Sequence, residues 1–191
     1  GAKSTEFMAP PHHGFALTRE AALRLALVTP AVSSLINPRQ SAPIEYAGSP
    51  LNLPETGGAF TAGARAGLPA PEATVQAVQG AAHLTALFGR CFVALYFSSE
   101  PRVPAALQQL TGAARSGAGA LHLVRVAAGG TASADAVIDQ LGQAWQRYDA
   151  AEDTLYLIRP DGYIMGRWRN ASAAADAIAA ALARAFSGDR P

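Results

Sequence analysis

The stretch DTLYLIRPDGYIMGRWR, residues 153–169, decides the fold class. Its two halves, 153–159 and 163–169, are short β-prone runs joined by Pro160-Asp161-Gly162. Proline presets the second position of a tight turn, and glycine accepts the positive φ that such a turn requires. The stretch therefore predicts two antiparallel strands connected by a hairpin.

The segments upstream of this hairpin predict alternating strands and helices. FVALYF, 92–97, is a continuous apolar run typical of a strand buried on both faces, and a second such strand is expected over 120–128. We expect a helix over 103–114 between them, and such a crossover makes the two strands parallel. A short strand over 74–78 and a short helix over 81–88, closed by Gly89, are expected ahead of this series.

Two further helices complete the predicted order. Ser133 is a candidate N-cap of the first, and Asn170 is a candidate N-cap of the last helix. The stripe predicted for the helix after Ser133 consists of Val137, Ile138, Leu141, Ala144, Trp145 and Tyr148. The order is β-α-β-α-β-β-α, in which a closing hairpin and helix replace a further β-α unit. We therefore predict an α/β fold of the thioredoxin-like type over 72–188, preceded by a helical and extended extension.

The first 71 residues lack this regular pattern. We expect 1–17 to be a tag, with Gly1–Phe7 ahead of Met8, followed by a disordered N-terminus. Over 18–71 we expect a helical segment, with Thr18 as N-cap, followed by a strap rich in proline and glycine. A strap of this length is expected to join two units or to pack on a missing one.

Composition limits the function classes. The chain has 191 residues, a net charge of +1 and no basic block, so nucleic acid is not an expected partner. No apolar run is long enough to cross a bilayer, so no membrane partner is expected. One cysteine allows neither an internal disulfide nor a cysteine-rich zinc site, and a reducing cytoplasm is the expected compartment.

Thioredoxin redox chemistry requires a low-pKa thiolate where the first core strand passes into its helix, with a second cysteine three residues on. That corner contains Ser98-Ser99-Glu100-Pro101 here, and the position of the facing cis-proline corresponds to Asp153. Cys91 begins the strand at the opposite end. It is either a peroxidatic or sensing thiol or, as we prefer, a half-buried structural one.

The remaining polar candidates are weaker. His12-His13 have no third metal ligand, and His83 and His122 are isolated. The side chains Tyr163, Arg167 and Arg169 alternate onto one strand face, where they could bind an anion or a partner; a solvated edge strand is the preferred interpretation. No glycine-rich phosphate motif follows a strand. We therefore assign no catalytic, cofactor-binding or metal-binding residue.

Four stretches together resemble a known family. Residues 155–164 (LYLIRPDGYI) with Arg167-Trp168 resemble the LVRPDGYVAWR ending of FAD-dependent aromatic-ring monooxygenases of the phenol hydroxylase and 3-(3-hydroxyphenyl)propionate hydroxylase type. The strap from Asn37 through Tyr46 to Ser49-Pro50-Leu51 is similar to the end of the FAD/substrate region of these enzymes. The run GARA at 63–66 resembles the entry into their last domain, and 84–97 resembles the element that follows it. The resemblance covers about 18–187.

The resemblance implies a non-redox, thioredoxin-like C-terminal domain that serves packing and subunit contacts. FAD and NAD(P)H would belong to the parent enzyme and not to this chain, which alone is not expected to be catalytic. The implied partner is the FAD/substrate domain of that enzyme, in the same polypeptide or in a separate subunit, and a homo-oligomer is expected. The alternative is a free-standing thioredoxin-like interaction module without a flavin partner.

Overall fold

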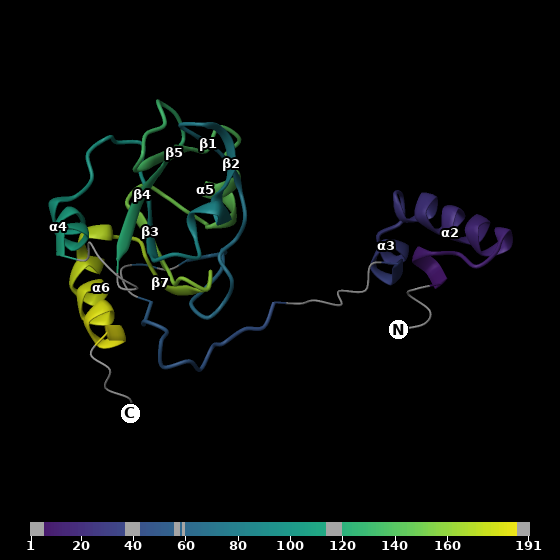
Figure 1. The fold of residues 1–191 in the computed structure, drawn as a ribbon, viewed down its shortest axis with the longest axis horizontal. Coiled ribbons are helices and arrows are strands. Elements are labelled where there is room, and N and C mark those ends of the chain that lie inside the picture. The colour runs from purple at the N-terminus through teal and green to yellow at the C-terminus, as the bar shows by residue number, and fades with distance from the viewer. Residues whose placement is uncertain (1–5, 37–42, 56–57, 59, 114–119, 187–191) are drawn as a thin grey trace. The chain divides into compact units, whose positions relative to one another are not determined.

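The computed structural model describes residues 6–36, 43–55, 58, 60–113 and 120–186. It divides into two compact units, Gly1–Ala42 and Pro43–Pro191, which are described separately (Figure 1). Among the described residues, no helix is long and apolar enough to cross a membrane.

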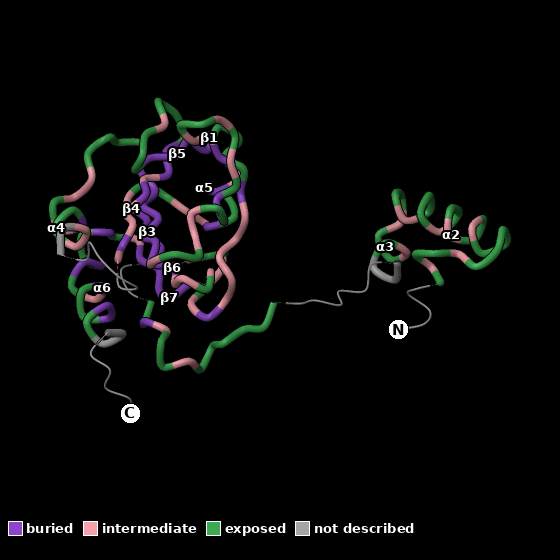
Figure 2. Tube along the Cα trace, viewed as in Figure 1, coloured by how far each residue is buried: buried purple, intermediate pink, exposed green. Residues whose placement is uncertain are grey.

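The described part of the first unit contains a helical turn at 6–8 and the helices α2 (His13–Ala26) and α3 (Pro30–Ile36). Helix α2 begins before the expected Thr18, whose hydroxyl donates to the carbonyl of Gly14 from within the helix at 3.0 Å. Residues 13–17, which were expected to belong to a disordered N-terminus, lie within α2. No residue of α2 is buried, which Figure 2 shows as a helix without purple segments.

The second unit is built on a seven-stranded sheet in the order β2-β1-β5-β4-β3-β6-β7. The first three strands in this order are β2 (Gly80–His83), β1 (Thr74–Ala77) and β5 (Ala136–Ile138). The predicted core strands are present as β3 (Phe92–Phe97), β4 (Leu121–Ala127), β6 (Thr154–Ile158) and β7 (Ile164–Trp168). Strand β3 pairs parallel with β4 and antiparallel with β6, and β6 pairs antiparallel with β7. Helices follow β3, β5 and β7 along the chain, so these core strands and helices form the predicted β-α-β-α-β-β-α order, with β5 as an added strand. The predicted fold class is confirmed.

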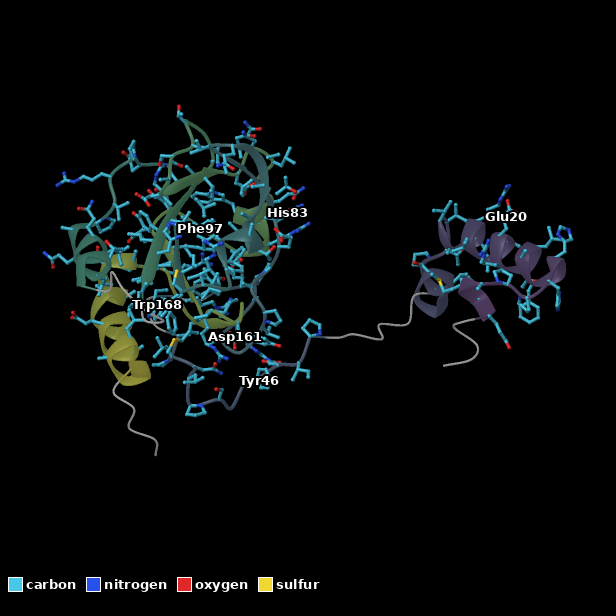
Figure 3. The ribbon with its side chains drawn as sticks, viewed as in Figure 1. Glu20, Tyr46, His83, Phe97, Asp161 and Trp168 are labelled. Atoms are coloured by element: carbon cyan, nitrogen blue, oxygen red, sulfur yellow. The ribbon has the colours of Figure 1, made fainter. Side chains whose placement is uncertain are left out.

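An apolar cluster lies on each face of the sheet. Alternation along β3 directs Ala94 and Tyr96 into the cluster beneath α4 (Ala105–Ala113) and α6 (Ala171–Phe186). The intervening residues, Leu95 and Phe97 among them, enter the cluster on the opposite face, together with Tyr148 and Tyr156. Figure 1 shows α4 and α6 together beside the sheet, and Figure 3 places Phe97 inside it. The predicted cap is confirmed, since Asn170 Oδ1 accepts the N–H of Ala173 at 3.0 Å.

Two predicted helices differ from the structure. Residues 81–88 form β2 (Gly80–His83), antiparallel to β1 (Thr74–Ala77), and a 3-10 turn, Leu84–Leu87. Gly80 has φ +113° and permits the tight reversal between the two strands. An alanine-rich run suits a helix or a strand, and pairing with β1 decides between them here.

The helix predicted after Ser133 is instead strand β5 (Ala136–Ile138) followed by the short helix α5 (Gln143–Arg147). The apolar residues of β5 extend the parallel pairing of β4. The carboxylate of Asp139 then accepts the N–H groups of Gln143 and Trp145, each at 3.0 Å, and so begins the helix later than predicted.

The described second half of the strap belongs to the α/β unit, so this unit begins at Pro43 and not at the predicted residue 72. The strap runs along the free edge of β7. Leu53 N–H donates to Met165 O at 2.7 Å, and Gly67 N–H donates to Ile164 O at 2.9 Å. These bonds pair with outward peptide groups at the start of β7, which would otherwise be an open sheet edge.

Candidate functional site

The corner that carries the dithiol in thioredoxin is occupied by a carboxylate here. Ser98 follows β3 and is 1% exposed. Its hydroxyl donates to Glu152, and the N–H of Ser99 donates to both carboxylate oxygens of Glu152 at 2.9 and 3.1 Å. We call these three residues the Glu152 clamp. It connects the end of β3 to the segment that precedes β6.

The electrostatics of the Glu152 clamp favour its charged form. Burial raises the pKa of Glu152, but hydrogen bonds from Ser98, from Ser99 and from the Glu100 peptide outweigh burial, so the pKa lies below its ordinary value. Nearby, burial is the main cause that raises the pKa of the Tyr96 phenol, and the carboxylates of Asp153 and Glu152 add to it. The negative charge at this corner is therefore fixed and already hydrogen-bonded.

Asp153 occupies the position that the sequence matched to the cis-proline of thioredoxin. It has φ +64°, donates its N–H to Phe97 O at 3.0 Å and accepts the N–H of Ala171 through its carbonyl at 3.1 Å. Asp153 thus joins β3 to the start of α6. Neither Asp153 nor the Glu152 clamp supplies a thiol or an activated nucleophile, since the hydroxyl of Ser98 is paired with a carboxylate and not with a base of suitable pKa.

Arg167 and Arg169 do not decorate a solvated edge strand, and that preferred interpretation is wrong. Their guanidinium groups lie 4.2 and 4.0 Å from the ring centre of Phe60 in the strap. Arg167 is 7% exposed, pairs with Glu55 at 2.7 Å and donates to the carbonyl of Ala62 at 2.9 Å. We call Phe60 with these two arginines the Phe60 cluster.

Asp149 completes the attachment of the strap. Its carboxylate pairs with Arg169 at 2.7 Å and accepts the N–H groups of Thr61 and Ala62 at 2.9 and 3.1 Å. Burial raises the pKa of Asp149, but these hydrogen bonds and the charge of Arg169 outweigh burial and lower it overall. The arginine face predicted from the alternation is therefore saturated within the chain, and it holds the strap against β7.

Tyr163 lies apart from the Phe60 cluster. Its ring packs against Tyr46 at a centroid distance of 5.2 Å, near the Arg159–Asp161 ion pair of the hairpin turn. Figure 3 shows Tyr46 and Asp161 at the same end of the α/β unit. The structure therefore separates Tyr163 from the two arginines with which alternation had grouped it.

In the part of the chain that the structure describes, the histidines and Cys91 do not gather into a metal site. Among the described residues, no group of three or more His, Cys, Asp or Glu side chains could hold a metal ion. Cys91 is half-buried and lines a groove together with His122, whose Nε2 lies 3.7 Å from Asp135 Oδ1. His83 lies 3.8 Å from Glu72, and His12 precedes α2 without capping it.

Sequence reasoning missed the partners that define these clusters. Glu152 is 54 residues from Ser98, and Glu55 is 112 residues from Arg167. No local spacing signals a contact over such separations. The Thr-Ala pair that binds Asp149 lies in a strap without any periodicity.

Comparison with known proteins gives matches in structure but not in sequence. No protein-family model and no curated protein matches the sequence. The flavin-dependent monooxygenase PieE, solved in complex with FAD and substrate, matches with a TM-score of 0.58 and 20% identity over 92% of this chain. Aklavinone-11 hydroxylase, solved with FAD and aklavinone, matches with a TM-score of 0.56 and 19% identity over 87% of this chain.

The chain shares its fold with part of each of these enzymes. It covers 30% of the PieE chain and 33% of the aklavinone-11 hydroxylase chain, so it spans about a third of the solved structures that it matches. The resemblance to FAD-dependent monooxygenases predicted from RPDGY and the strap is confirmed at the level of the fold. The match also extends over more of the chain than a thioredoxin-like core alone would occupy.

Proposed function

We propose that this chain is the non-redox, thioredoxin-like part of a flavin-dependent aromatic hydroxylase and supplies packing surface to the FAD/substrate domain. The observation that carries the proposal is the fold match, which extends over 92% of this chain but only 30% of a flavin-dependent monooxygenase. FAD and NAD(P)H chemistry would reside in the part of the enzyme outside this chain.

The Glu152 clamp supports a non-redox role for this chain. Thioredoxin-type catalysis needs a thiolate stabilised by peptide N–H groups at this corner. Here the N–H of Ser99 is bound to a carboxylate of the same chain. A fixed negative charge at this position opposes formation of any thiolate, which supports a structural role for the corner.

Helix α2 provides the proposed partner surface. Four residues of α2 and the two residues that follow it have large, exposed apolar side chains: Phe15, Leu17, Leu23, Leu25, Leu27 and Val28. At 100° per residue these side chains point to several sides of the helix, and a helix that is apolar on several sides is typical of a protein interior. We infer that the FAD/substrate domain covers α2, and that the isolated chain self-associates through the same residues.

Co-expression with the FAD-binding region encoded in, or beside, the same gene tests this function. We expect the two parts to co-purify, and we expect Leu17→Asp/Leu25→Asp to abolish co-purification. Leu141→Asp is the matched control, because Leu141 is 70% exposed in the α/β unit and its substitution should leave the complex intact. Co-purification that is insensitive to the α2 substitutions, or no association at all, would contradict the proposal.

A free-standing interaction module is the second candidate. It is favoured by the completeness of the α/β unit, whose β7 edge is covered by its own strap and whose two faces each carry an apolar cluster. A reading frame with no FAD-binding region within it or beside it would select this candidate. Rapid loss of the Cys91 thiol with peroxide would instead select a thiol peroxidase.

A further inference from the structure

Strand β4 is paired along only part of its outer edge. On its inner side it pairs with β3 over its full length up to Val126, from Phe92↔Leu121 to Phe97↔Val126. On its outer side, β5 reaches only Arg125, Val126 and Ala127. Figure 1 shows β5 beside one end of β4 and α4 on the side of the other end.

The backbone hydrogen bonds on the two sides of β4 show in which direction each of its peptide groups points. Even-numbered residues of β4 face β3, since Ala120 O and Val126 O accept from Phe92 and Ser98. Odd-numbered residues face outward, since Arg125 N–H donates to Asp135 O and Ala127 O accepts from Asp139. The N–H and C=O groups of Leu121 and Leu123 therefore point away from β3. No described residue pairs with them there.

A groove of about 520 Å³ lies along this open part of the edge. Strand residues Leu121 to Leu123 line it, and α4 with its approach contributes Val103, Gln108 and Thr111. Gln108 is held in place, since its amide donates to Val103 O at 3.1 Å. The groove therefore offers both apolar side chains and a row of open peptide groups.

Asp135 gives the groove its charge. Its side chain is 81% exposed at the point where β5 begins, and His122, at 3.7 Å, is its only ion-pair partner among the described residues. An exposed carboxylate at this position favours a basic group on whatever occupies the groove.

We propose that this β4 edge groove binds an extended segment of a partner protein by strand addition, and that the segment alternates apolar and basic residues. The added strand would continue the line of β5 and pair with the outward peptide groups of Leu121 and Leu123. Its apolar side chains would lie on Val103 and the leucines, and a lysine or arginine would face Asp135. The proposal does not depend on the flavoprotein function.

Amide exchange measured by NMR on the full chain tests this proposal with three synthetic hexapeptides. Ac-Lys-Val-Lys-Val-Lys-Val-NH2 is expected to slow exchange at Leu121 and Leu123 by about tenfold or more. The acidic counterpart with Glu in place of Lys, and the basic peptide with alternate amides N-methylated, should leave exchange unchanged. Asp135→Asn should weaken binding of the basic peptide by about 2- to 5-fold, whereas Asp176→Asn, on exposed α6 surface, should not.

Several results would overturn the proposal. Slow exchange at Leu121 and Leu123 in the free chain would mean that the edge is already covered. Binding without protection of these two amides, or equal protection by the N-methylated peptide, would exclude strand addition. Equal binding of the acidic peptide would exclude the role assigned to Asp135.

Discussion

The N–H of Ser99 donates to both carboxylate oxygens of Glu152, at 2.9 and 3.1 Å, at the corner where thioredoxin carries its dithiol. This relationship makes the corner a structural junction between β3 and the segment before β6. It also gives the proposed loss of redox function a physical cause besides the missing cysteines, because the local charge is negative and fixed.

Removal of the Glu152 charge should destabilise the α/β unit. We expect Glu152→Gln to lower the free energy of unfolding by about 0.5–1.5 kcal/mol at neutral pH, a value kept small because Glu152 is exposed to solvent. The folded-state pKa lies below the ordinary 4.5, so this contribution is present above pH 4.5 and is lost as the pH falls through the folded pKa. Urea unfolding of both proteins should therefore converge at low pH, and an unchanged difference would contradict the assignment.

A cysteine placed at this corner should be unreactive. In Ser99→Cys, the neighbouring carboxylate should hold the thiol pKa at or above about 8.5, the value of a free cysteine. Alkylation rates followed against pH measure this pKa, with Cys91→Ser as the background. In the double variant Ser99→Cys/Glu152→Gln, the thiol pKa should be lower than in Ser99→Cys. A thiol pKa well below neutrality in Ser99→Cys alone would show that the corner retains thiolate-stabilising character.

The Phe60 cluster should control attachment of the strap. Arg167→Met leaves Glu55 and the carbonyl of Ala62 without their partner, and we expect a loss of about 2–4 kcal/mol in the free energy of unfolding. Arg65→Met is the control, because Arg65 forms an exposed ion pair with Glu45, and its loss should be hardly measurable. Proteolysis of the strap should accelerate in Arg167→Met only. Equal stability of the two variants would contradict the assigned role.

Two glycines with similar backbone angles should respond differently to alanine. Gly67 has φ +87°, and a Cβ there would lie 2.6 Å from Tyr46 O; Gly162 has φ +82° and no atom within 4 Å of such a Cβ. Gly162→Ala should cost about 1 kcal/mol, for the left-handed conformation alone. Gly67→Ala should cost about 2–4 kcal/mol, because the strap must also move. Thermal unfolding of both variants measures the difference, and equal costs would refute the close approach.

The exposed apolar residues of α2 should make the isolated chain self-associate. Light scattering over a concentration series is expected to show species larger than the monomer, and Leu17→Asp/Leu25→Asp should be monomeric. A wild-type monomer at all concentrations would contradict both this expectation and the burial of α2 by a partner.

The sequence predicted the parts of the fold that rest on strong local signals. Strand β3 is apolar at every position, the RPDGY turn joins β6 and β7 in an antiparallel hairpin, and Asn170 caps α6 as expected. Alanine-rich runs have no such signal. Strand β2 was therefore identified only by its pairing with β1, and β5 only by its pairing with β4. The strap was predicted as a linker because contacts with β7 leave no periodicity in its sequence.

The candidate site was predicted only by what it lacks. The missing dithiol is visible in Ser98-Ser99-Glu100, but the carboxylate that takes its place comes from a segment more than 50 residues away. The arginine face was visible as an alternation, whereas its burial by Phe60 and Asp149 depends on the fold. Long-range partners of this kind require the tertiary structure.

The visible absorption spectrum tests the central claim most directly, when it is recorded for the purified chain and for its complex with the co-expressed FAD-binding region. We predict no flavin absorption band at about 450 nm in the isolated chain after incubation with FAD. In the complex, we predict the band that corresponds to stoichiometric bound FAD. Stoichiometric FAD bound by the isolated chain would contradict the account.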